Sequence, residues 1–162
     1  MTTNREFFIK RWEAEQKAFR NVLAAVPAEQ LKYSPHEKST SAGDLACQLA
    51  IEQLGIAELL TAGETNYQPK QCPPIDQILS EWDRATDEVR SALGASSDEK
   101  WSGRAKFLFN GAPVWEDSLE EMLWGFLFDM VHHRGQLSTY LRPMGSKVPS
   151  IYGPSGDDQG GA

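Results

Sequence analysis

The sequence has few cysteines, no long hydrophobic run and no excess of positive charge. Only two of its 162 residues are cysteine, which is too few for a disulfide framework or a thiolate zinc site. No run of about 18 apolar residues is present, so we expect no transmembrane helix and no membrane partner. The formal net charge is −7 and lysine and arginine form no cluster, which argues against a nucleic-acid partner.

Several motifs that carry well-known chemistry are also missing. The sequence contains no Walker lysine loop, no GxGxxG after a strand, no GxSxG and no HExxH. Nucleotide binding and serine hydrolase chemistry therefore have no support. The first ten residues are charged and lack the hydrophobic segment of a secretory leader, so we expect a cytoplasmic protein. In that reducing compartment Cys47 and Cys72 should be free thiols.

Four segments carry apolar residues at helical spacing, and these define the predicted helices: residues 4–26, 42–61, 74–94 and 118–142. Thr3, Ser41 and Ser118 are each followed three residues later by an acidic residue, a pattern typical of helix N-termini. Four helices of this length in one short chain predict an all-α fold, a four-helix bundle.

A short segment and a tail lie outside the predicted helices. Residues 107–115 place Asn110 and Gly111 between two short apolar runs, which predicts a hairpin or an irregular segment between the third and fourth helices. We expect residues 1–153 to form a single domain. Residues 154–162 are rich in glycine and aspartate, and we expect a flexible tail there.

The fourth predicted helix carries polar residues at its apolar face. On a helical wheel His133 falls inside the apolar stripe, whereas His132 points outward. Asp129 and Gln136 lie at one edge of the stripe and Arg134 at the other. Asp129 and His133 are four residues apart, a spacing that can present two ligands to one divalent metal. A hydrogen-bonded pair that satisfies a core histidine has the same spacing, so both interpretations stay open.

The second predicted helix offers a facing pair of polar residues. Glu52 falls within the apolar stripe of this helix, and Gln48 lies one turn earlier at its edge. A buried glutamate is rarely left unpaired. Glu52 could therefore form a salt bridge with Arg134 or with an arginine of the first helix, or it could give a carboxylate to a metal. Gln48 is neutral and would be a weak ligand.

Two segments resemble a known family. Residues 128–153 read FDMVHHRGQLSTYLRPMGSKVPSIYG, which closely resembles the C-terminal signature of the DinB/YfiT-like family. Residues 39–50 read STSAGDLACQLA and are similar to the second-helix motif of that family. The resemblance covers most of residues 5–153. It implies a four-helix bundle with an unusual helix order, a damage-inducible stress-response family and, often, a homodimer.

The resemblance also implies a metal site. Many members of that family hold nickel or zinc on three histidines, one from the second helix and two, spaced i, i+4, from the last. His133 matches the second histidine of that pair, Asp129 stands at the position of the first, and Gln48 stands at the second-helix position. The implied site is thus a degenerate one for nickel, zinc or manganese, with low occupancy or none because of Gln48.

An enzyme built on this metal site would need a catalytic set as well, for which we hypothesise the following residues. Glu52 would be a fourth ligand or the general base, and Arg134 or Gln136 would orient the ligands or bind an anionic group of the substrate. The implied function is a metal-dependent thiol transferase or hydrolase acting on a small molecule. The alternative is a metal-free helical module for binding or dimerisation without catalysis, in which Asp129, His133 and Gln136 form a satisfied polar network.

Overall fold

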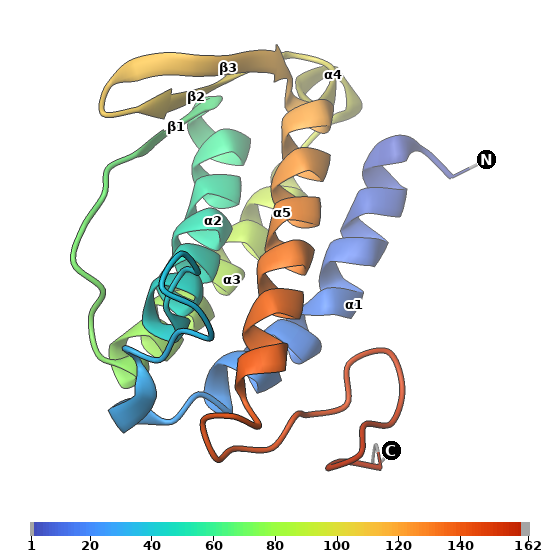
Figure 1. Cartoon of the computed structure of the whole chain (residues 1–162). Coiled ribbons are helices and arrows are strands. Elements are labelled where there is room, and N and C mark those ends of the chain that lie inside the picture. Colours follow the sequence, from blue (N-terminus) through green and yellow to red (C-terminus); the bar gives the residue numbers. More distant parts are fainter. Residues whose placement is uncertain (1, 160–162) are drawn as a thin grey trace.

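The computed structural model describes residues 2–159 and consists of four long helices with a three-stranded sheet across one end (Figure 1). The long helices are α1 (Asn4–Ala24), α2 (Ala42–Ala62), α3 (Ile75–Ala95) and α5 (Leu119–Tyr140). The short elements are the 3-10 helix η1 (Ala28–Gln30), helix α4 (Asp98–Trp101) and strands β1 (Glu64–Tyr67), β2 (Arg104–Phe109) and β3 (Ala112–Ser118).

The long helices begin at side-chain caps that are visible in the sequence. The Thr3 hydroxyl accepts a hydrogen bond from the Glu6 amide, and the Glu6 carboxylate accepts one from the Thr3 amide. Ser41 caps α2 and Ser118 caps α5 in the same way. The four predicted helices are therefore present, with bounds that differ by a few residues.

The prediction of an all-α four-helix bundle is wrong, because the chain also forms a mixed sheet. Strands β2 and β3 form the antiparallel hairpin whose turn is Asn110-Gly111, and both turn residues have positive φ (50° and 80°). Strand β1 pairs in parallel with β2, so that Glu64 lies opposite Lys106. With only four residues, β1 has too little pattern of its own to be recognised, and its partner lies far away in the sequence.

Helix α2 is the central helix of the molecule. It packs against α3, α5 and β1, and most of its apolar side chains are fully buried. By length and composition α2 could cross a membrane, but 67% of its most apolar window is buried inside the protein, as in the core helix of a soluble protein. The side chains that fill the core beside it come from all the long helices, among them Phe8, Trp12, Phe19, Leu49, Trp82 and Leu123.

The chain after α5 returns along α1. Arg142 and Asp157 form an ion pair of 2.8 Å between the end of α5 and this returning segment. The backbone amide of Val148 also donates to the Asp157 carboxylate, and together these two donors lower the pKa of Asp157. The part of the expected flexible tail at residues 160–162 lies outside the described residues, and the flexibility of the remainder stays a prediction.

Candidate metal centre

Helices α2 and α5 pack side by side and bring three potential metal ligands together. The Nε2 atom of His133 lies 3.4 Å from Oδ2 of Asp129 and 3.8 Å from Oε1 of Glu52. One ligand atom from each of the three residues lies within 4.8 Å of the others. Glu52 is only 8% exposed, whereas the Asp129 side chain is 55% exposed. The cluster therefore has a buried side on α2 and an open side on α5.

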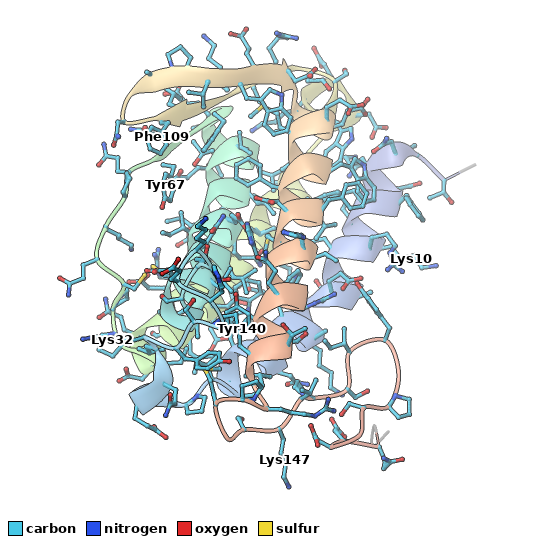
Figure 2. All side chains as sticks on the ribbon, in the orientation of Figure 1. Lys10, Lys32, Tyr67, Phe109, Tyr140 and Lys147 are labelled. Atoms are coloured by element: carbon cyan, nitrogen blue, oxygen red, sulfur yellow. The ribbon has the colours of Figure 1, made fainter. Side chains whose placement is uncertain are left out.

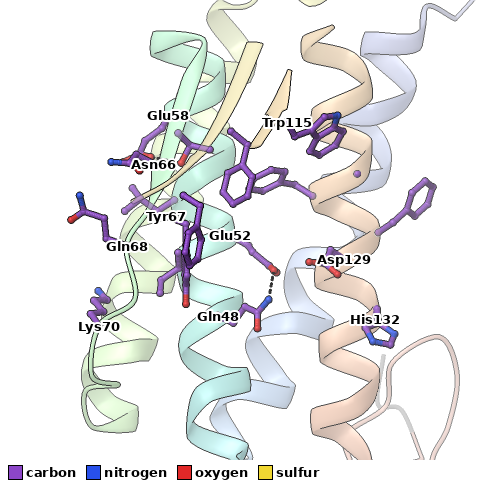
Figure 3. A pocket seen from close by; sticks show the side chains of 18 residues that line it. Gln48, Glu52, Glu58, Asn66, Tyr67, Gln68, Lys70, Trp115, Asp129 and His132 are labelled. Atoms are coloured by element: carbon purple, nitrogen blue, oxygen red, sulfur yellow. Dashed lines mark hydrogen bonds between the residues drawn. The ribbon is translucent and has the colours of Figure 1, made fainter. Parts of the chain in front are cut away.

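Two glutamines complete the cluster, and Figure 3 shows the first of them, Gln48, hydrogen-bonded to Glu52. The Gln48 amide nitrogen donates to Oε1 of Glu52 over 2.9 Å and lies 2.8 Å from Nε2 of His133. On the other side of the ring, Nδ1 of His133 lies 2.9 Å from Oε1 of Gln136, an atom that only accepts hydrogen bonds. These contacts place the imidazole proton on Nδ1, so that Nε2 presents its lone pair to the cluster.

Glu52 is the least satisfied member of this cluster. Its Oε2 atom is the one buried side-chain nitrogen or oxygen within residues 2–159 that has no hydrogen-bond donor. Burial, the neighbouring Asp129 charge and a carboxyl–carboxylate hydrogen bond with Asp129 together raise the pKa of Glu52 to about 9. The metal-free cluster thus holds a proton on Glu52 at neutral pH.

This donor set fits a divalent metal ion. An ion at the cluster would take the place of the Glu52 proton and would offset the repulsion between the ionised Glu52 and Asp129. Two carboxylates and one imidazole suit zinc, manganese or nickel, and no thiolate is present to favour a softer metal. Gln48 joins as a ligand only if its amide turns to present the oxygen.

The structure does not bring Arg134 into this centre. Its guanidinium is 2% exposed and points toward α1, where Nη1 lies 2.7 Å from the Glu15 carboxylate. Nη2 donates to the Tyr152 hydroxyl over 2.6 Å, and the guanidinium stacks 4.4 Å above the Phe19 ring. The expected salt bridge between Glu52 and Arg134 is therefore not formed, and Arg134 holds the returning C-terminal segment against α1.

A pocket of about 870 Å³ opens beside the cluster, between α2, α5 and the underside of the sheet (Figure 3). Its walls are largely aromatic. Tyr67 and Phe109, which come from β1 and β2, stack with ring centroids 5.7 Å apart (Figure 2). The pocket is also lined by Glu52, Glu58, Thr65, Lys70, Phe107, Trp115, Phe126, Asp129 and His132.

Sequence reasoning missed the whole β1 side of this pocket. Thr65 and Tyr67 alternate with polar residues directly after Gly63, but four residues are too few for a clear strand pattern. Gly63 ends α2 in a left-handed conformation with φ of 75°, which turns the chain toward the sheet. A glycine cap followed by alternating β-branched and aromatic residues is the signal that could have indicated this strand.

Alanine substitutions at two glycines of α5 should change the stability of the protein in opposite directions. A Cβ atom at Gly125 would lie 2.5 Å from Cη2 of Trp115, whereas a Cβ at Gly135 would meet nothing within 4 Å. We expect Gly125→Ala to lower the free energy of unfolding by about 1–3 kcal/mol, because the indole in the pocket wall must move. Gly135→Ala should raise it by about 0.5–1 kcal/mol through helix propensity.

Urea unfolding of the two alanine variants measures these changes directly. Gly135→Ala is the matched control, since it makes the same substitution on the same helix without the contact. Equal effects of the two substitutions would mean that Trp115 does not pack tightly over Gly125.

Known proteins share this chain's sequence pattern and its architecture. The sequence matches the DinB family over residues 1–159. It is 25% identical over 159 residues to the Bacillus subtilis (strain 168) protein described as uncharacterized protein YrdA, covering 94% of this chain and 90% of that one.

Two crystal structures share the fold. A DinB-like protein from Bacillus cereus ATCC 10987 superposes with a TM-score of 0.70 at 19% identity, over 90% of this chain and 95% of that one. A DinB-like protein from Bacillus subtilis gives a TM-score of 0.70 at 16% identity, over 89% and 96% of the two chains. The family match spans nearly every residue, and the chain belongs to the DinB family.

Proposed function

We propose that Glu52, Asp129 and His133 bind one divalent metal ion and that the protein acts on a small molecule held in the adjoining pocket. The single observation that supports this most strongly is the cluster itself, in which one ligand atom from each of the three residues lies within 4.8 Å of the others and the buried Oε2 atom of Glu52 accepts no hydrogen bond. A buried carboxyl oxygen without a donor is costly unless a cation or a proton occupies the space beside it.

Each residue of the centre has a separate role in this proposal. Glu52 and Asp129 supply carboxylate oxygens, and His133 supplies its Nε2 lone pair because Gln136 accepts the proton of Nδ1. Gln136 is thus a positioning residue. Gln48 sits where a further ligand would be, and its hydrogen bonds to Glu52 and His133 keep those two side chains oriented.

The reaction that we propose is a metal-dependent thiol transfer or hydrolysis. A divalent metal supplies Lewis acidity, which lowers the pKa of a coordinated water or thiol. The pocket has a volume typical of small-molecule sites and borders the open, Asp129 side of the cluster. Metal binding would displace the proton that Glu52 holds in the metal-free state, and the Glu52 oxygen that does not bind the metal can then accept a proton from a neighbouring group.

A metal-free binding module is the second candidate, and one observation favours it. The Gln48 amide bridges Glu52 and His133, so the polar side chains already contact one another through hydrogen bonds. In that case the same pocket binds its ligand without catalysis. A homodimeric state, a cytoplasmic location and the absence of nucleic-acid and membrane partners remain predictions for either candidate.

Metal content separates the two candidates. We expect protein purified without a chelator or a histidine tag, and then dialysed against zinc, manganese or nickel, to retain about one ion per chain. Asp129→Ala and His133→Ala should each abolish this retention while leaving the helical circular dichroism spectrum unchanged. His132→Ala is the matched control, because His132 is the exposed neighbour of His133 and is not in the cluster.

Elemental mass spectrometry before and after dialysis gives the stoichiometry. Equal metal content in His132→Ala and His133→Ala would locate the ion elsewhere. Background metal content in the unmodified protein under all three loadings would favour the metal-free module.

A further inference from the structure

We propose that the pocket binds a small hydrophobic amine, with its ammonium group paired to Glu58 and its apolar body against the aromatic walls. The proposal names the substrate class of this pocket. It rests on the proposed function in one respect, namely that the end of the amine nearer the metal cluster is the end that reacts. Glu58 belongs to α2 and lies six residues beyond Glu52, or about 9 Å along the helix axis. The amine would therefore bind at the opposite end of the pocket from the metal cluster.

Glu58 is a half-buried carboxylate that lacks a cationic partner. Its side chain accepts one hydrogen bond, from the Thr65 hydroxyl over 2.5 Å. No lysine, arginine or histidine of the described chain forms an ion pair with Glu58, although it lines the pocket. A carboxylate has about four acceptor positions, so most of its hydrogen-bonding capacity is open to a ligand.

The charges that line the pocket leave an excess of negative charge. Glu52, Glu58 and Asp129 are acidic, and Lys70 is the one lysine or arginine in the lining. The Lys70 ammonium already lies 3.4 Å from the Glu81 carboxylate. A divalent metal, or a proton on Glu52, would offset charge at the cluster end only. The Glu58 end stays negative whether or not a metal is bound, and this favours a cationic ligand there.

The Phe126 ring lies close to the Thr65 hydroxyl that binds Glu58, because Gly55 has no side chain. A Cβ atom at Gly55 would lie 2.9 Å from Cε1 of Phe126 and 3.3 Å from the hydroxyl oxygen of Thr65. The Phe126 ring thus lies just across this gap from the hydroxyl that holds Glu58. Phe107 packs edge-to-face on Phe126 with centroids 5.7 Å apart, and Trp115 stacks on its other side.

This combination of groups selects for an ammonium ion over an anion. The faces of aromatic rings attract cations, and a carboxylate beside them adds a charge-assisted hydrogen bond. An aromatic carboxylate of the same size would place its negative charge against Glu58 without a compensating cation. Aromatic amines with a short alkyl chain, such as tryptamine, have a body that can stack on Trp115 and Phe126 and a head that can reach Glu58.

Isothermal titration calorimetry with tryptamine and 3-indolepropionate tests the proposal, since these probes share a ring and differ in charge. The protein is titrated twice, once in excess chelator and once after loading with zinc. We expect tryptamine to bind in both states and indolepropionate to bind at least about tenfold more weakly to the chelator-treated protein. Glu58→Gln keeps an acceptor for Thr65 and should weaken tryptamine binding by about tenfold or more.

Glu64→Gln is the matched control, because Glu64 is an exposed carboxylate at the start of β1 that does not line the pocket. It should leave tryptamine affinity unchanged. Indolepropionate binding as tightly as tryptamine to the chelator-treated protein, an unaltered affinity in Glu58→Gln, or no tryptamine binding at all would each overturn the proposal. Loss of metal binding alone would leave the chelator-treated result intact, so failure of the amine site is distinguishable from failure of the metal centre.

Discussion

Replacing Glu52 with glutamine is expected to remove metal binding and to stabilise the metal-free protein. Removing a residue that only hydrogen-bonds to a metal ligand already weakens metal binding by about 10–100-fold. The loss of a ligand carboxylate should therefore weaken it by about 100-fold or more. Glutamine has the shape of protonated glutamate, and its amide can donate to Asp129 as the carboxyl proton does. The variant therefore keeps the packing of the side chain at position 52 but has no carboxyl group there that can titrate.

The stabilisation follows from the raised pKa of Glu52. The carboxyl titrates at 4.5 in the unfolded chain and at about 9 in the folded one. Its contribution to folding is fully present below pH 4.5 and is lost progressively as the pH rises to about 9, because the unfolded state releases the proton first. At pH 7 this costs the unmodified protein about 3 kcal/mol, which Glu52→Gln should recover.

Urea unfolding of metal-free protein between pH 5 and pH 8 measures this difference. The gap between Glu52→Gln and the unmodified protein should widen with pH, at a rate of up to about 1.4 kcal/mol per pH unit. Glu64→Gln replaces an exposed carboxylate of β1, serves as control and should show no such gap. A constant difference between Glu52→Gln and the unmodified protein would mean that Glu52 is ionised in the metal-free state.

Replacing Arg134 with methionine is expected to destabilise the protein by about 3–5 kcal/mol, since it leaves Glu15 as a buried charge without its main partner. Arg11 also contacts Glu15 but is itself 45% exposed, so it compensates in part. The Tyr152 hydroxyl loses one of its two partners in the same substitution, which should loosen the returning C-terminal segment. Metal content per folded chain should stay unchanged.

The control substitution is Arg20→Met, which breaks an ion pair with Asp83 between α1 and α3 in which both side chains are about half exposed. It should cost less than about 1 kcal/mol. The double substitution Glu15→Gln with Arg134→Met should recover part of the stability, because it removes the unpaired charge. Loss of metal in Arg134→Met at full stability would instead place Arg134 in the metal centre.

The long helices could be predicted because they are encoded locally, whereas the contact of α2 with α5 was expected only from the family resemblance. Apolar periodicity and serine or threonine caps define each helix, and they are visible within a window of about 20 residues. A polar residue within an apolar stripe points into the interior whatever the helix packs against. Glu52 and His133 met this condition on two different helices, and the structure brings them to 3.8 Å.

The destination of Arg134 and the sheet could not be predicted in this way. The wheel placed Arg134 at the edge of the apolar stripe, but only the position of α1 decides that its partner is Glu15 and not Glu52. Strand β1 depends on pairing with β2, which follows α3 in the sequence. The aromatic pocket needs both strands at once, so neither its volume nor the role of Glu58 is visible in any single segment.

The parallel pairing of β1 with β2 also bears on the order in which the molecule assembles. Glu64 and Lys106 are 42 residues apart, whereas the β2–β3 hairpin closes over a two-residue turn. Loop-closure entropy delays contacts of long sequence separation, so we expect β1 to join after α2 and α3 have packed. The ligand pocket is then the last part of the fold to form, and mild denaturation should empty it while the helical core persists.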